Sequence, residues 1–286
     1  MKRQREGIML AYPLELKRLE RWGFPFYVQP KLDGMRMRVE LSTPNVNMLS
    51  STGRRLNFAL PHIELSLNCL AEELHSHGIF ELDGELYYHH MPFEDIVGIC
   101  QRTKTPHHNH WRMQYHIFDH ISEDPFSTRI NDFPPALAEW HPCKLVDTAK
   151  VENMQDLTTW LNICISTGYE GIILRHPNAS YERKRSSWMM KFKPSREDTY
   201  KIEGVIEEVS IHGEAKGTLG SLILSDPEGN IFHVGTGLTE HLRNILWESR
   251  SSLKGMGARI KYQHITKGGV PRFPVFIEVT SPNEID

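Results

Sequence analysis

The chain has 286 residues, of which 39% are hydrophobic and 9% aromatic, a composition typical of a packed protein with one large or two ordinary domains. Its formal net charge of −3 at pH 7 excludes a uniformly basic nucleic-acid coat protein, although a basic surface on one face is compatible with that sum. Four widely separated cysteines without a CxxC pair argue against a disulfide framework and favour a reducing, cytoplasmic setting. No apolar run is long enough for a signal-peptide core or a membrane span, so we expect neither secretion nor membrane contact.

The first part of the chain alternates between helix-like and strand-like segments. Residues 64–78 and 156–168 carry apolar side chains at helical spacing, and each segment ends at a glycine, which is a common helix stop. The sequence therefore predicts a mixed domain of sheets and helices over residues 1–198.

The last part of the chain is rich in short β-like runs separated by glycine turns, from residue 201 onward. One helix is expected over residues 239–253, and a final pair of strands around residues 258–265 and 273–279. This pattern predicts a small β-barrel over residues 199–286, so the whole chain is predicted to be an α+β protein of two domains.

The segment QPKLDGMRMRVE, residues 29–40, places a lysine beside an aspartate and a glycine at the start of an alternating strand. In an extended chain, Lys31 and Asp33 point to the same side. Gly34 permits a close backbone approach or an unusual dihedral angle next to that lysine. On its own such a pattern is usually a surface strand with a lysine–aspartate neighbour pair, so other segments have to decide whether it forms a site.

The segment FELDGELYY, residues 80–88, carries three acidic side chains on one strand face. The acidic face holds Glu81, Asp83 and Glu85, and the apolar face holds Phe80, Leu82, Leu86 and Tyr88. Like charges on one face repel each other. The acidic face is therefore either simply solvated or turned toward a cation or a ribose hydroxyl.

Two later segments add a further acid and two lysines at strand positions. Glu170 stands at the mouth of an apolar strand, residues 172–174, directly after a glycine that ends a helix. Lys191 and Lys193 share one face of the next strand, which as a solvated edge strand would also favour lysine. Residues 181–201 contain seven Lys or Arg against three Asp or Glu, so basic charge is concentrated here within an acidic protein.

In this order, these segments resemble the covalent nucleotidyltransferase superfamily, and most closely the compact ATP-dependent DNA ligases of viruses, phages and bacteria. Five segments match motifs of that family. KLDGMR (31–36) is similar to KxDGxR, ELDGEL (81–86) to the DGE motif, YHIFDHI (115–121) to the FD strand, EGIILR (170–175) to EGxxxR, and MKFKP (190–194) to KxK. Five ordered motifs are far more specific than one. The last third is similar to the ligase OB domain through GTLGSLIL, FHVGTGLTEHLR and GGVPRFPVF. The resemblance implies an ATP-grasp-like nucleotidyltransferase (adenylation) domain followed by an OB-fold barrel.

The resemblance also implies the reaction. Lys31 would attack the α-phosphorus of ATP, pyrophosphate would leave, and the AMP would pass from the lysine to the 5′-phosphate at a nick before the 3′-hydroxyl displaces it. An ordinary lysine is an ammonium ion at neutral pH. We therefore expect burial, a divalent metal ion and the nearby Lys191 and Lys193 to destabilise the charged form of the nucleophile.

The resemblance assigns roles position by position. The catalytic residues are expected to be Lys31, Asp33, Arg36, Lys191 and Lys193. The nucleotide-binding residues are expected to be Gln29 at the adenine edge, Phe118 stacked on the adenine ring, and Lys31, Arg36, Glu85, Lys191 and Lys193. The ligands of Mg²⁺, or of Mn²⁺ in its place, are expected to be Asp83, Glu85 and Glu170. The residues expected to contact DNA are Arg54, Arg55, Lys216 and Arg272.

The chain departs from the family at two points. Ser51 stands where the family often has an arginine, so Arg54 or Arg55 is expected to grip the 5′-phosphate instead. The end of the chain, IEVTSPNEID, has no RxDK-like motif, and Lys267 or Arg272 is expected to take over the orientation of pyrophosphate.

Three functions compete on this evidence. The first is a monomeric ligase acting on nicked double-stranded DNA, which GTLGSLIL and FHVGTGLTEHLR favour because they are similar to the DNA ligase barrel. The second is the same chemistry on RNA, by an RNA ligase or a GTP-dependent mRNA capping enzyme. The third is a non-catalytic OB-type binder of nucleic acid, which would leave Lys31 unmodified.

Overall fold

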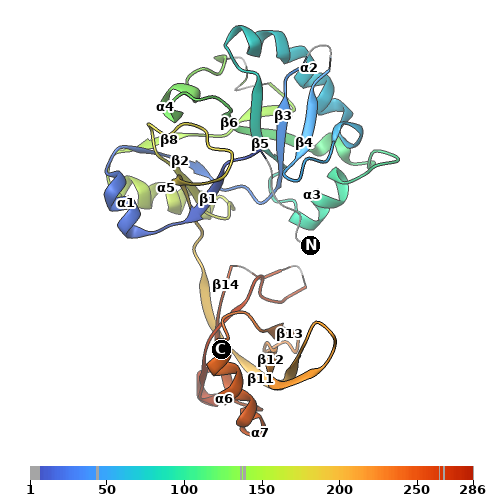
Figure 1. Ribbon diagram of the computed structural model, residues 1–286, viewed down its shortest axis with the longest axis vertical. Coiled ribbons are helices and arrows are strands. Elements are labelled where there is room, and N and C mark those ends of the chain that lie inside the picture. Colours follow the sequence, from blue (N-terminus) through green and yellow to red (C-terminus); the bar gives the residue numbers. More distant parts are fainter. Residues whose placement is uncertain are drawn as a thin grey trace. The chain divides into compact units, whose positions relative to one another are not determined.

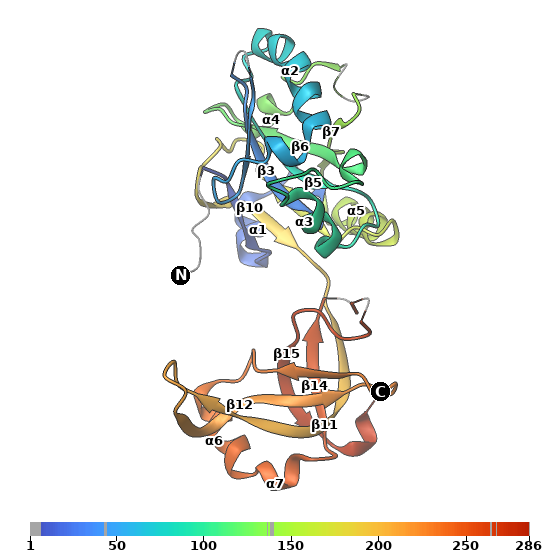
Figure 2. The same cartoon turned by 90° about the vertical axis from the view of Figure 1, so that its right-hand side faces the viewer.

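The computed structural model describes residues 7–42, 45–135, 137, 140–263, 265–266 and 268–285. The chain divides into two compact units, Met1–Lys193 and Pro194–Asp286. Both units appear in Figures 1 and 2, and each is described by itself. The division falls at the first two residues of the charged segment KPSREDTYKIEG. In the described part of the chain, no helix combines the length and the hydrophobicity that a bilayer crossing needs.

The first unit contains two five-stranded sheets. The order in one sheet is β1 (Leu10–Pro13), β10 (Arg185–Phe192), β9 (Ile172–Arg175), β2 (Phe26–Pro30) and β8 (Ala149–Val151). Only the β1–β10 pair is parallel. Helices α1 (Leu16–Trp22) and α5 (Met154–Ser166) pack on one face of this sheet, where Leu19, Leu157 and Cys164 join a core with Val28 and Leu174. The opposite face is left to polar side chains such as Gln29 and Arg175, which are nevertheless buried.

The second sheet of this unit carries the acidic strand. Its order is β4 (Asn47–Ser50), β3 (Met35–Glu40), β5 (Glu81–Tyr87), β6 (Gln114–His120) and β7 (Cys143–Leu145). Helices α2 (Pro61–Ser76) and α3 (Phe93–Cys100) cover its apolar face, where Leu67 and Ile96 share a core with Met37, Val39 and Leu82. The short helix α4 (Phe126–Arg129) follows β6. This packing leaves the polar faces of β3, β5 and β6 for the site.

The two helices expected in this unit are confirmed, as α2 and α5. Gly78 and Gly168 lie just past them at φ +75° and +91°, values that favour glycine. Burial of Met37 and Val39 confirms the alternation predicted for the strand after Gly34. Phe80 lies just before β5 and does not join the core, because it is 60% exposed and its ring stacks on that of His75 in α2.

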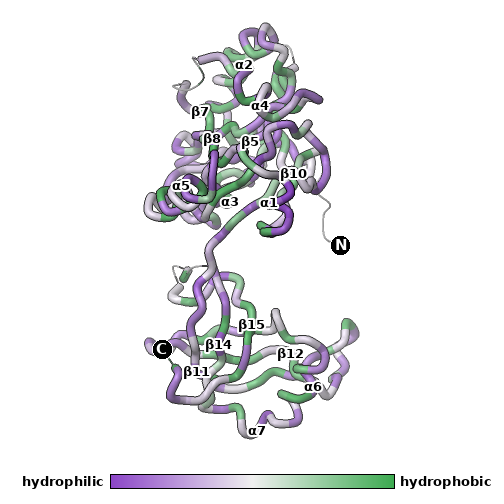
Figure 3. Tube along the Cα trace, turned by 90° about the vertical axis from the view of Figure 1, so that its left-hand side faces the viewer, coloured by the Kyte–Doolittle hydropathy of each residue, from purple (hydrophilic) through white to green (hydrophobic). Residues whose placement is uncertain are grey.

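The second unit is built on one five-stranded antiparallel sheet. Its order is β13 (Ile231–Val234), β12 (Ala215–Ser225), β11 (Arg196–Val209), β14 (Gly257–Tyr262) and β15 (Val275–Thr280). The single helix expected over residues 239–253 is present as two, α6 (Glu240–Glu248) and α7 (Arg250–Leu253), which meet at Ser249. Thr239 caps α6, since its hydroxyl accepts a hydrogen bond from the Leu242 N–H at 3.2 Å. Hydrophobic stretches of the trace run through the strands of both units (Figure 3).

Candidate active site

Lys31 lies in the connection between β2 and β3, so it stands where the two sheets of the first unit meet. Its backbone N–H donates to the Gly171 carbonyl at 2.8 Å, and the Glu170 N–H donates to the Lys31 carbonyl at 3.2 Å. A Cβ at Gly34 would lie 2.3 Å from the Leu86 carbonyl oxygen. The close backbone approach expected of Gly34 is therefore confirmed, and the chain holds Lys31 directly against Glu170.

Two lysines share the carboxylate of Glu170. Lys31 Nζ lies 2.5 Å from Glu170 Oε2, and Lys193 Nζ lies 2.7 Å from Glu170 Oε1. Burial by itself would raise the pKa of Glu170, but the two lysines outweigh it and the net pKa is lowered. We call Lys31, Glu170 and Lys193 the lysine cluster. Since Lys31 is held in an ion pair, this pair has to open before the amine can react.

Glu85 is an acid whose ionised form is disfavoured. Burial raises its pKa to about 7, although Arg36 and Lys31 lie close enough to act in the opposite direction. A half-buried carboxyl of this kind gains stability from an additional cation. The negative charges of Asp33 and Glu170 also act on the neighbouring Tyr87, so these acids lie in the same part of the unit.

Arg36 and Asp83 form a bidentate ion pair beside the lysine cluster. Arg36 Nε lies 2.6 Å from Asp83 Oδ1, and Arg36 Nη2 lies 2.5 Å from Asp83 Oδ2. The guanidinium also lies over the Phe118 ring, 4.4 Å from its centre. Asp83 is fully buried and accepts a further hydrogen bond from the Tyr181 hydroxyl. Its carboxylate is thus committed to groups of the protein.

The acidic face of β5 is neutralised by arginines. Arg38 Nη1 and Arg183 Nη2 each donate to a different oxygen of Glu81 at 2.6 Å. Arg36 and Arg38 come from the polar face of β3, which is the antiparallel neighbour of β5. The sequence analysis considered only a solvated face or a face turned toward a ligand. It omitted a third possibility, ion pairs with the neighbouring strand, although the alternating arginines of β3 indicated it.

Gln29 is 2% exposed, and both ends of its amide are bonded to the protein. Its Nε2 donates to the Phe118 carbonyl and to Thr148 Oγ1, each at 2.9 Å. Its Oε1 accepts from Arg175 Nε at 2.8 Å. The geometry gives no support to the expected contact of this amide with adenine, and it instead makes Gln29 a support for the strand that carries Phe118.

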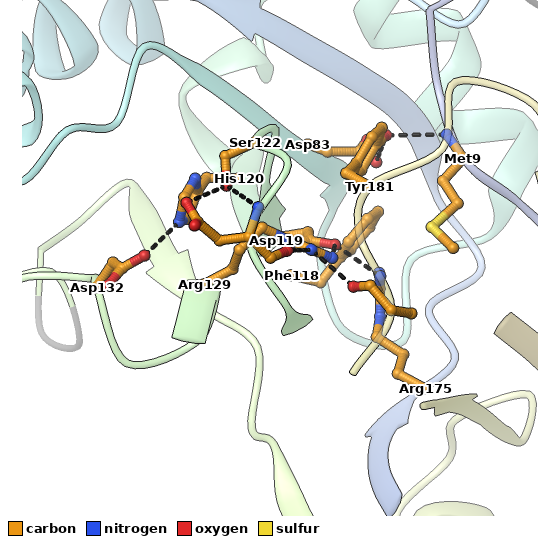
Figure 4. Close-up of polar contacts among 12 residues, drawn as sticks. Met9, Asp83, Phe118, Asp119, His120, Ser122, Arg129, Asp132, Arg175 and Tyr181 are labelled. Atoms are coloured by element: carbon orange, nitrogen blue, oxygen red, sulfur yellow. Dashed lines mark hydrogen bonds and ion pairs between the residues drawn. The ribbon is translucent and has the colours of Figure 1, made fainter. Parts of the chain in front are cut away.

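Asp119 holds two buried arginines that sequence reasoning missed as site residues (Figure 4). Arg129 donates to it from Nε at 2.8 Å and from Nη2 at 3.0 Å, and Arg175 donates from Nη1 at 2.8 Å. Asp119 and Arg175 belong to the FD and EGxxxR motifs, which was a usable signal, whereas nothing in the spacing pointed to Arg129. We refer to these contacts, with those of Arg36, Asp83 and Tyr181, as the arginine network.

The three expected metal ligands do not meet at one point. Among the described residues, no group of three or more His, Cys, Asp or Glu side chains has the arrangement of a metal site. Asp83 is taken by Arg36 and Tyr181, which leaves Glu85 and Glu170. Two carboxylates fit Mg²⁺ when substrate phosphates and water supply the other oxygens, and the raised pKa of Glu85 is the kind of feature a cation would relieve.

The residues expected to contact DNA are spread over both units. Arg55 is exposed and its Nη2 donates to Asn47 Oδ1 at 2.5 Å, while Arg54 is half-buried. Lys216 Nζ forms an ion pair with Glu208 at 2.6 Å, and the Arg272 guanidinium lies 5.0 Å from the centre of the Phe273 ring.

Two further residues, Ser51 and Lys267, were named where the chain departs from the family. Ser51 stands in the turn after β4, close to both Arg54 and Arg55 in sequence. Lys267 lies outside the described residues.

Comparison with known proteins gives consistent matches over both units. Residues 8–193 match the family model described as ATP dependent DNA ligase domain, and residues 212–279 match the model described as DNA ligase OB-like domain. The chain is 29% identical over 202 residues to a DNA ligase of Haemophilus influenzae, covering 69% of this chain and 70% of that one. It is 34% identical over 233 residues to a DNA ligase of Methanococcus aeolicus, covering 74% of this chain and 40% of that one.

Solved structures share the fold. One from a study of Lig E DNA ligases described as binding DNA with a minimal scaffold has a TM-score of 0.72 at 22% identity, covering 96% of this chain and 98% of that one. The Chlorella virus DNA ligase-adenylate has a TM-score of 0.52 at 23% identity, covering 95% of this chain and 98% of that one. The predicted nucleotidyltransferase and OB-like architecture is confirmed by these matches.

Proposed function

Because this chain belongs to the family of ATP-dependent DNA ligases, we propose that it seals nicks in duplex DNA and that Lys31 is the residue that carries the AMP. The RNA-directed enzymes and the non-catalytic binder are not favoured by the matches, which name DNA ligases throughout. The lysine cluster supports the assignment of Lys31 most directly. In it, the lysine of the KxDG motif contacts Glu170, and Lys193 contacts the same carboxylate.

In the first step the Lys31 amine attacks the α-phosphorus of ATP. A nitrogen–phosphorus bond forms, the bond to pyrophosphate breaks, and the two protons that the Lys31 ammonium loses pass to water after its pair with Glu170 Oε2, 2.5 Å away, has opened. Lys193, once released from Glu170, and Lys191 near the end of β10 would bind phosphate oxygens. The residues act mainly by positioning groups and balancing negative charge, as expected for phosphoryl transfer.

In the later steps the AMP moves to the 5′-phosphate of the nick, and the 3′-hydroxyl then displaces it. We assign Arg36 to the reacting end of the DNA, because Asp83 and Phe118 hold its guanidinium in a fixed plane. Asp33 would orient the same end, and Phe118 would also contact the adenine ring. Asp83 is assigned to holding Arg36, not to a metal ion.

Mg²⁺ would be held by Glu85 and Glu170 together with phosphate oxygens. When bound, it would neutralise negative charge on the phosphates during transfer. Its arrival would compete with Lys31 and Lys193 for Glu170, which is consistent with an ion pair that opens when the nucleotide binds.

The DNA contacts are assigned to Arg54, Arg55, Lys216 and Arg272. For a protein with a net charge of −3, contacts made through a few arginines and lysines to phosphates should weaken steeply as salt is added. Such contacts weaken between about 50 and 200 mM salt, so nick binding should be measured over this range. The logarithm of the affinity should fall linearly with the logarithm of the salt concentration. Affinity that does not change over this range would contradict the assignment.

The experiment that tests the function is intact-mass measurement after incubation with Mg²⁺ and, separately, ATP, GTP or NAD. We expect an AMP adduct from ATP alone, lost in Lys31→Ala and discharged with sealing on nicked DNA but not on nicked RNA. Lys150→Ala is the matched control, since Lys150 forms a similar pair with Glu152 at 2.7 Å on the surface of the same unit. An adduct that persists in Lys31→Ala, or none with any nucleotide in protein that starts unmodified, would overturn the proposal.

A further inference from the structure

Tyr181 connects Asp83 to the beginning of the described chain. It lies between β9 and β10 and is 5% exposed. Its hydroxyl donates to Asp83, and its oxygen accepts the backbone N–H of Met9 at 2.9 Å (Figure 4). The phenol therefore has both a donor and an acceptor role, with partners from segments far away in the sequence.

These contacts close into a ring. Arg36 Nη2 donates to the Met9 carbonyl at 3.1 Å as well as to Asp83, so the ring runs from Arg36 to Asp83, to Tyr181, to Met9 and back to Arg36. A guanidinium can only donate and an ionised carboxylate can only accept. The direction of every hydrogen bond in the ring is thereby fixed, and none of them can reverse without breaking another.

The ring leaves one edge of Arg36 available. The hydrogen bonds that Arg36 makes to described residues use Nε and Nη2, which leaves Nη1. The Phe118 ring under the guanidinium, 4.4 Å from its centre, restricts the plane in which that edge can turn. The Arg36 side chain keeps 20% of its surface exposed.

We propose that Tyr181 is a positioning residue for nick sealing, which sets the direction of the free edge of Arg36 through Asp83 and the backbone of Met9. This inference rests on the proposed function, in which Arg36 acts on the reacting end of the DNA. Tyr181 does not touch the substrate, because both partners of its buried phenol are protein groups. Its effect is confined to the step that uses Arg36.

The test is Tyr181→Phe, with each step of the reaction measured separately. We expect phosphodiester formation from a pre-adenylylated nick to slow by roughly tenfold to a hundredfold, because small errors in placing a reacting group cost that much. Lysyl-AMP formation from ATP and the KM for nicked DNA should change little, so that DNA-adenylate accumulates. The matched control is Tyr115→Phe, which removes a buried phenol that donates to the Met37 carbonyl at 3.2 Å in the same unit. It should lower stability without affecting one step more than another.

A double-mutant cycle separates positioning from general destabilisation. Arg36→Lys keeps the charge but cannot make the bidentate contact. If Tyr181 works through Arg36, the double variant should seal no more slowly than Arg36→Lys alone, whereas independent effects would multiply. Asp83→Asn, which keeps the side-chain volume, provides a second route if Tyr181→Phe folds poorly, and it should show the same accumulation of DNA-adenylate.

The outcomes distinguish this inference from the function it rests on. Failure of the unmodified protein to form the AMP adduct or to seal would overturn the proposed function itself. Normal sealing by that protein, together with equal slowing of all steps in Tyr181→Phe and Asp83→Asn or with multiplying effects in the double variant, would overturn only the role of Tyr181.

Discussion

The lysine cluster and the arginine network lie side by side in the first unit and use the same kinds of charges in opposite ways. In the lysine cluster, the side chains of Lys31 and Lys193 keep 19% and 20% of their surface exposed and share one carboxylate. In the arginine network, Asp119 is fully buried and its two arginines are 1% and 4% exposed. Partners that solvent can reach are able to exchange with a nucleotide, whereas buried partners are held in place. The comparison separates half-buried groups that can meet a substrate, which include Arg36 at 20% exposed, from the buried Asp119 pairs that hold the chain in place.

The largest effect is expected from removing the central acid of the buried region. Asp119→Ala would leave Arg129 and Arg175 buried without a counter-charge, and breaking such a pair costs about 3–5 kcal/mol. Urea denaturation should show that loss in the free energy of unfolding. Asp132→Ala is the control, because the Asp132 side chain is 30% exposed and its carboxylate bonds only to His120, at 3.0 Å, in the described structure, and it should cost much less. Equal losses in the two variants would remove the distinction between the regions.

The next effect is expected in catalysis and not in stability. Glu170→Gln removes the charge that holds both lysines, and loss of one such electrostatic group costs roughly a hundredfold in rate. The rate of AMP-adduct formation should fall by that factor, while the free energy of unfolding changes by about 1 kcal/mol or less, since both lysines are only half-buried and can reach water. Glu152→Gln breaks the surface pair with Lys150 and serves as the control. A large stability loss in Glu170→Gln would place the lysine cluster in the same class as the arginine network.

A smaller loss is expected from changing the amide between the two regions. Gln29→Glu would direct an oxygen at the Phe118 carbonyl and at Thr148 Oγ1, whose own hydrogen is donated to the Val146 carbonyl. Losing buried donors in this way should lower the free energy of unfolding by about 1–3 kcal/mol. Gln114→Glu is the control, because only the oxygen of that amide is bonded, and it should be nearly neutral. Normal stability of Gln29→Glu would mean that the amide is not needed as a donor.

The smallest effect is on the pH dependence of stability. It distinguishes the contribution of the ion pairs from that of a histidine far from them. Burial, aided by His110, lowers the pKa of His62, although its contact with the Met113 carbonyl opposes the shift. The unfolded chain therefore takes up a proton before the folded one as pH falls below the usual histidine range, and stability is lost there. The pKa of Glu81 is also lowered, which places its loss of stability at more acidic pH. Urea midpoints should show that His62→Gln reduces the first decline and leaves the second in place, because burial also lowers the pKa of His116, to about 4, and of His176.

A control at the opposite end of the same helix completes that measurement. His77 is exposed and caps α2, so His77→Gln should leave both declines in place. If His62→Gln leaves the first decline unchanged, the loss near neutral pH belongs to another group.

The sequence was sufficient for the parts of the site that lie within continuous motifs. The position of Lys31, the close approach at Gly34 and the acid at Glu170 all followed from local spacing, because strand alternation and glycine geometry are local properties. The acids of β5 were also found, but their partners were not, since pairing depends on which strand becomes the neighbour. The register that places Arg38 opposite Asp83 is a property of the folded sheet.

The remaining contacts could not have been read from the sequence. Tyr181 meets Asp83 across 98 residues and Met9 across 172, and no motif of fixed spacing describes either contact. Gln29 shows the opposite difficulty. Its position suggested a contact with the nucleotide, yet tertiary packing uses its amide for Phe118, Thr148 and Arg175.

The participation of Met9 through its peptide group has an evolutionary consequence. A backbone N–H and carbonyl are supplied by almost any amino acid, so the ring constrains the path of the chain at this position more than the identity of the residue. The Met9 side chain is buried beside Tyr181 and Met189, which asks only for an apolar residue of suitable size. Across relatives, we expect different apolar residues at this position, but neither a deletion nor a proline. The position would then have a functional contact without a conserved amino acid.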